Sequence, residues 1–114
     1  MGDRGQVRFI DGDNEVWFYT HWGASNLTRT VQAALKRGKS RWDDPEYLAR
    51  IIFCEMVKGD VEDLLGYGIG FSEHGDVWQV VTVNASEQTV EVRRPEIGPI
   101  SFEEYIAKGL PDGS

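Results

Sequence analysis

Residues 6–20 read QVRFIDGDNEVWFYT, and this stretch decides the fold class. Two runs rich in aromatic and β-branched residues, which favour strands, flank the segment DGDN at 11–14. Asp, Gly and Asn tolerate the positive φ angles of tight turns, so the pattern predicts a β-hairpin. Because the two strands of a hairpin pair antiparallel, the sheet that begins here is expected to be largely antiparallel.

A helix is expected next, over about residues 26–37. Leu27, Val31, Ala34 and Leu35 recur at helical spacing and form one apolar stripe. The preceding Ser25 and Asn26 are both suitable N-cap residues, and Gly38 with the basic residues before it is typical of a helix end.

The segment DDPEYLARIIFCEMVKG, residues 43–59, predicts a second helix over 45–58. Asp44 stands at the cap position and Pro45 at the first helical position, where its missing N–H costs nothing. Leu48 and Ile52 begin an apolar face. Cys54 falls beside this face, so a buried, unreactive thiol is the favoured interpretation.

The remainder of the chain predicts three strands and a short helix. The strand-like segments are YGIGFS (67–72), VWQVVTVN (77–84) and QTVEVRR (88–94), and ASE (85–87) makes a hairpin of the last two. In SFEEYIAKG (101–109), Ser101 and Glu104 form a capping box. The order ββααβββα predicts a single α+β domain over 1–114, with a largely antiparallel sheet of about five strands and the helices on one face.

The chain has 114 residues, a net charge of −7 and a pI near 4.7, which argues against general nucleic-acid binding. Residues 29–50 are the exception, with six basic against three acidic residues, so the chain is acidic with one basic corner. No apolar run approaches the ~20 residues that cross a membrane. A single cysteine excludes an intramolecular disulfide, and a cytoplasmic location is expected.

Two glycine-containing motifs are weak. KRGKSR (36–41) contains GKS, but a phosphate loop needs glycine where Ala33 stands, and a helix is expected before it. GYGIG (66–70) is expected to continue as a strand, so its glycines are expected to let a backbone or an aromatic ring approach closely. His21, His74 and Cys54 lack the spacing of a metal site, and no cofactor is expected.

The candidate binding residues are His21, Trp22, Arg37, Lys39, Arg41 and Trp42. Two interpretations stay open. In one, the two tryptophans anchor the ends of the first helix and His21 is a hydrogen-bonded support. In the other, tryptophan rings stack a base and the basic residues meet a phosphate, which places an anionic ligand in a shared pocket. No catalytic residue is assigned.

Three blocks carry a resemblance: YTHWG (19–23), RWDDPEYLARIIF (41–53) and GYGI (66–69). Together they resemble a set of small uncharacterised proteins of tailed bacteriophages and bacterial genomes, notably of actinobacteria. The resemblance spans about residues 16–92, and its middle block is long and specific. It implies context only, namely an accessory protein of phage or prophage type, and it transfers no site residues.

Three functions follow as hypotheses. The first is a non-enzymatic protein that binds a protein partner, for example to inhibit a host or defence protein. The second is a small-molecule binder or hydrolase for an anionic, nucleotide-like ligand at the His21, Arg41 and tryptophan region. The third is an assembly role, in which a second copy of the chain is the partner.

Overall fold

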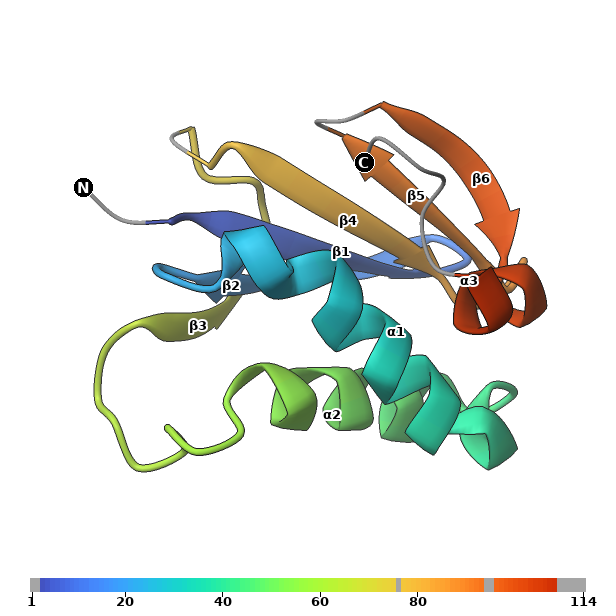
Figure 1. Ribbon diagram of the computed structural model, residues 1–114, viewed down its shortest axis with the longest axis horizontal. Helices are drawn as coiled ribbons and strands as arrows, with labels where there is room; N and C mark the ends of the chain where they lie inside the picture. Colours follow the sequence, from blue (N-terminus) through green and yellow to red (C-terminus); the bar gives the residue numbers. More distant parts are fainter. Residues whose placement is uncertain (1–2, 76, 94–95, 109–114) are drawn as a thin grey trace.

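The computed structural model describes residues 3–75, 77–93 and 96–108, and its architecture is α+β (Figure 1). The strands are β1 (Gly5–Asp11), β2 (Asn14–Thr20), β3 (Tyr67–Gly70), β4 (Gln79–Asn84), β5 (Thr89–Arg93) and β6 (Ile97–Ser101). The helices are α1 (Leu27–Arg37), α2 (Pro45–Met56) and α3 (Phe102–Lys108), with short 3-10 turns at Ala24–Asn26 and Lys39–Arg41. The expected class is confirmed.

One mixed sheet contains all the described strands, in the order β3-β2-β1-β4-β5-β6. The neighbouring pairs are antiparallel except at the centre, where β1 runs parallel to β4. Both predicted hairpins form, β1–β2 and β4–β5. The sheet therefore consists of two antiparallel halves joined by one parallel pair.

Side chains alternate between the two sheet faces, and one of these faces is covered by all three helices (Figure 1). On that face Val7 and Phe9 of β1 lie beside Val81 and Val83 of β4, and all four are under 5% exposed. The apolar stripe of α1 packs against them, with Leu27, Val31, Ala34 and Leu35 buried as expected. The core thus lies between the helices and one face of the sheet.

The prediction of about five strands is wrong, because residues 97–101 form a sixth. Its sequence, IGPIS, carries Gly98 and Pro99, and both residues disfavour a strand in sequence-based assignment. Proline is tolerated here because β6 is an edge strand, where half of the N–H groups need no partner.

The helix ends follow the expected signals more closely. Helix α2 begins at Pro45 after Asp44, although the Asp44 side chain makes no capping hydrogen bond. At the start of α3 one half of the expected capping box is present, since Ser101 Oγ accepts the Glu104 N–H at 3.1 Å. Cys54 is exposed, so the expectation of a buried thiol is wrong. It lies at the edge of the apolar stripe of α2, where the helix no longer covers the sheet.

The Tyr105 hydroxyl ties α3 to α1. It donates to the Thr28 carbonyl at 2.6 Å, and the side chain is only 1% exposed. We expect Tyr105→Phe to lower the free energy of unfolding by about 1 kcal/mol, because the buried hydrogen bond is lost while the ring still packs. Urea denaturation measures this.

Tyr47→Phe is the matched control, because Tyr47 is 54% exposed. We expect this change to alter the free energy of unfolding by no more than about 0.5 kcal/mol. Equal losses in the two variants would contradict the position given to Tyr105.

Candidate functional site: the helix-free face of the sheet

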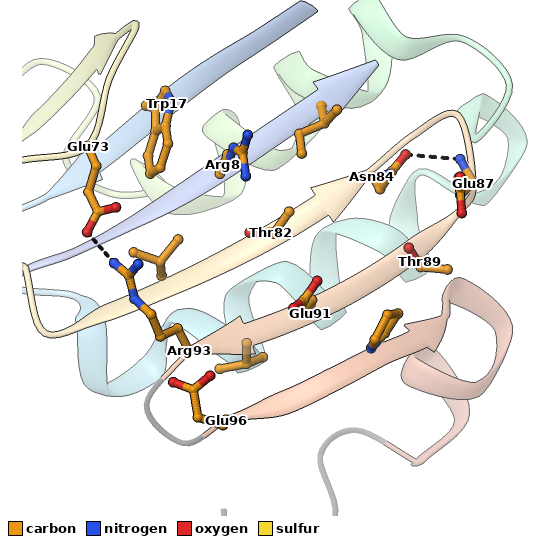
Figure 2. A pocket seen from close by; sticks show the side chains of 14 residues that line it. Arg8, Trp17, Glu73, Thr82, Asn84, Glu87, Thr89, Glu91, Arg93 and Glu96 are labelled. Atoms are coloured by element: carbon orange, nitrogen blue, oxygen red, sulfur yellow. Dashed lines mark hydrogen bonds and ion pairs between the residues drawn. The ribbon is translucent and has the colours of Figure 1, made fainter. Parts of the chain in front are cut away.

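The face of the sheet that carries no helix holds a groove of about 360 Å³ (Figure 2). One row of cross-strand neighbours crosses it, from Trp17 on β2 to Arg8 on β1, Thr82 on β4 and Glu91 on β5. The labelled side chains that line it are Arg8, Trp17, Glu73, Thr82, Asn84, Glu87, Thr89, Glu91, Arg93 and Glu96. We call this surface the sheet groove.

Arg8, Glu15 and Trp17 form a fixed polar group at one side of the sheet groove. Arg8 donates from Nε and Nη2 to Glu15 Oε1 at 2.9 and 2.7 Å, and the Trp17 indole N–H donates to Oε2 at 3.0 Å. The Arg8 guanidinium also lies 5.6 Å from the centre of the Trp17 ring. The Trp17 hydrogen bond, then Arg8, hold the pKa of the Glu15 carboxyl below its ordinary value of 4.5.

A second ion pair joins Glu73, in the segment between β3 and β4, to Arg93 on β5 (Figure 2). Arg93 Nε is buried and has no hydrogen-bond partner among the residues that the structure describes. A buried guanidinium N–H without an acceptor carries a free-energy penalty. Glu91 and Glu96 lie close by along the same side of the groove.

The segment between β3 and β4 is held over this face by side chains of β1 and β2. Gln6 is 1% exposed; its amide donates to the Ser72 carbonyl at 3.3 Å and accepts the His74 N–H at 2.9 Å. The His74 ring stacks on Tyr19 with 4.6 Å between ring centres. These contacts position Glu73 against Arg93.

His21 and Trp22 lie elsewhere, at the end of β2. His21 Nδ1 is 3.2 Å from both Arg4 Nε and the Tyr19 hydroxyl. Because arginine can only donate, Nδ1 is the acceptor and the ring proton is assigned to Nε2. The Trp22 indole donates to the Tyr67 hydroxyl at 3.1 Å, and the residue is 48% exposed, so of the two tryptophans considered as helix anchors this one is only half-buried.

The basic residues of the helix connection have partners of their own. Arg37 pairs with Glu55 at 3.1 Å, Lys39 pairs with Glu103 at 3.2 Å, and the Arg41 guanidinium lies 5.3 Å from the centre of the Tyr47 ring. Trp42 is 7% exposed and donates to the Leu35 carbonyl at 3.0 Å, which confirms it as an anchor.

The structure does not bring the six predicted residues together. His21 and Trp22 precede α1. Arg37 is the last residue of α1, and the other three candidates follow it. Eleven helical residues place these two groups about 16 Å apart along the axis. The six residues therefore do not line one shared pocket for an anionic ligand.

Sequence reasoning missed the residues of the sheet groove. Its polar members alternate with buried valines in β4 and β5, and this alternation does mark one face of each strand. The sequence gives no signal that β1 pairs with β4, however, and only that pairing places Arg8 beside Thr82.

Comparison of the chain with models of protein families, with curated proteins and with solved structures gave no match in any of the three. Within the described residues, no helix has the length and apolar character needed to cross a membrane. Nor do residues 3–75, 77–93 and 96–108 contain a group of three or more His, Cys, Asp or Glu side chains placed to hold a metal ion.

Glu15 makes the stability of this face depend on pH. Its pKa is lowered by folding, so its contribution is present above the ordinary value of 4.5 and is lost as the pH falls through the lowered value. We expect wild type to resist urea better than Glu15→Gln at about pH 7, and the difference to shrink as the pH falls below 4.5. A difference in urea midpoint that persists or grows at low pH would contradict the assigned hydrogen bonds.

The ring of Trp22 lies so close to residue 66 that only glycine fits there. This is the close approach of an aromatic ring that was expected for the glycines of residues 66–70. The φ of Gly66 is +99°, and a Cβ added here would lie 2.3 Å from two Trp22 ring atoms. We expect Gly66→Ala to cost about 1–3 kcal/mol in thermal or urea unfolding. Gly68→Ala is the matched control, because nothing lies within 4 Å of its added Cβ.

Proposed function

We propose that the protein acts by binding a protein partner through the sheet groove, as a small acidic accessory protein of phage or prophage type that works in the cytoplasm. Inhibition of a host or defence protein is the form of this function that we favour. The observation that supports it is that helices cover only one of the two sheet faces. Three helices cover one face, whereas the other presents a preformed groove with fixed ion pairs.

The charge of the sheet groove favours a partner surface that carries basic groups. Four glutamates and two arginines are among its lining residues, and both arginines already pair with glutamates. Complementary charge across an interface raises the association rate and discriminates between partners. An acidic protein that occupies a basic channel of its target is an inhibitor of the kind that we propose.

Glu91→Arg tests this proposal. Glu91 is exposed within the groove, so the change should leave folding intact within about 0.5 kcal/mol. We expect capture of the partner from an actinobacterial lysate to fall at least about ten-fold, because the reversed charge removes an attraction and adds a repulsion. Quantitative mass spectrometry compares the captured proteins.

Glu46→Arg is the matched control, since it makes the same charge change at an exposed position on α2, a helix that packs against the opposite face. Equal capture by the two variants, or no captured protein with wild type, would contradict the proposal.

The alternative, an anionic nucleotide-like ligand, predicts a different result. Arg37 and Lys39 pair with acidic residues, and the sheet groove has more acidic than basic residues. We therefore expect no rise in melting temperature with nucleotides or cyclic nucleotides. Stabilisation that His21→Ala abolishes would favour the alternative over the partner-binding proposal.

A further inference from the structure

The outer edge of β3 is a second candidate binding surface, two strands away from the centre of the sheet groove. β3 is an end strand of the sheet and pairs only with β2 within the described chain (Figure 1). The His21 N–H donates to the Gly66 carbonyl at 2.8 Å, and these two residues continue the β2–β3 register. In an antiparallel ladder, hydrogen-bonded pairs alternate with non-hydrogen-bonded pairs. Gly68 and Gly70 therefore bond inward, and the N–H and C=O groups of Tyr67 and Ile69 point to the open edge.

The two edges of the sheet differ in how they are protected. At the opposite end, β6 carries Pro99, and its pairing with β5 has a register irregularity between Val90 and Val92. Proline and bulges are common devices that prevent another chain from adding to an edge. β3 contains neither proline nor lysine, and its sequence is Tyr-Gly-Ile-Gly. Gly68 and Gly70 place no side chain on the helix-free face, so a chain can approach this strand closely there.

Exposed apolar side chains gather around the unprotected edge. Leu64 is 95% exposed, Leu65 79%, Ile69 60% and Phe71 84%. Large apolar side chains so exposed within eight residues mark an interaction site more often than a chance feature of a monomer surface.

An apolar cleft adjoins β3 on the helix side. Its volume is about 330 Å³, and Phe18, Phe53, Cys54 and Ile69 are among the residues that line it. It arises because α2 packs over β2 but does not cover β3. The side chains of Tyr67 and Ile69 face the same side, since Ile69 pairs with Phe18 of the core. Every second side chain of an added strand would point toward this cleft.

The surroundings of the edge are acidic. The Tyr67 hydroxyl donates to Asp60 Oδ2 at 3.0 Å. Burial raises the pKa of this hydroxyl, and the nearby carboxylates of Asp60 and Asp63 raise it further. Glu62 adds a further acid to the same segment. The apolar edge is thus bordered by carboxylates, which basic flanking residues of a partner would complement.

We propose that the β3 edge binds an extended segment of another protein as an added strand, with apolar side chains at alternate positions and Lys or Arg at its ends. The backbone groups of Tyr67 and Ile69 provide the hydrogen bonds, and the apolar cleft provides specificity, as in other complexes formed by strand addition. This surface is separate from the sheet groove and does not rest on the function proposed for it. A second copy of the chain fits less well, because two chains of net charge −7 each would meet at acidic edges over a four-residue strand.

The test uses the synthetic peptide KRVTVTVKR, with EEVTVTVEE as the charge control. Two readouts report binding: amide NMR shifts of the intact protein, and protection of the single thiol, Cys54, from a thiol reagent. We expect the basic peptide to shift the Tyr67 and Ile69 amides and to slow the reaction of Cys54. The acidic peptide should bind at least about ten-fold more weakly.

Two variants examine the edge directly. Ile69→Pro removes an outward N–H at a position where an edge strand tolerates proline, and Ile69→Lys keeps the N–H but places a cation on an exposed site. Both should weaken the basic peptide at least about ten-fold, whereas Glu91→Arg in the sheet groove should bind it as wild type does. Ile69→Lys keeps the test decisive if the proline variant unfolds.

Three results would overturn the proposal. They are no binding of the basic peptide, equal binding by wild type and Ile69→Lys, and self-association in sedimentation that Ile69→Lys abolishes, which would assign the edge to a second copy. Because Glu91→Arg affects only the groove, a failure of one surface is distinguishable from a failure of the other.

Discussion

The parallel pairing of β1 with β4 is the constraint on which the rest of the structure depends. It joins residues more than seventy positions apart, Gly5 with Gln79 through Ile10 with Asn84, and it unites two antiparallel halves in one sheet. On one face it brings Val7 beside Val81, and the three helices pack on the resulting apolar surface. On the other face it brings Arg8 beside Thr82, which creates the floor of the sheet groove. Core and candidate site are thus two consequences of one register.

Two surfaces of the molecule present polar groups that the core does not use. The sheet groove offers fixed side-chain charges, with a buried Arg93 N–H still without an acceptor among the described residues. The β3 edge offers backbone groups beside exposed apolar side chains. Both surfaces are bordered by more acidic than basic groups, so both favour partners that carry positive charge. The two proposals together assign this small acidic protein two surfaces for engaging another protein.

Local signals in the sequence were enough for most of the fold. The hairpins, the start of α2 at Pro45 and the Ser101 cap each depend on a few neighbouring residues, and they appear where expected. Strand β6 was missed because Gly98 and Pro99 argue against a strand unless its edge position is known. The alternative in which His21 and Arg41 share a pocket does not fit, because α1 separates them. The groove was missed because the pairing of β1 with β4 is not local.

Amide hydrogen exchange of the free protein, followed residue by residue by NMR, tests directly whether the sheet ends at an open β3 edge in the described register. We expect slow exchange at Gly68 and Gly70, which bond to β2, and fast exchange at Tyr67 and Ile69, which face outward. Protection at Val81 and Val83 in the central strand should exceed both. Slow exchange at Tyr67 and Ile69, or the reverse alternation, would contradict it.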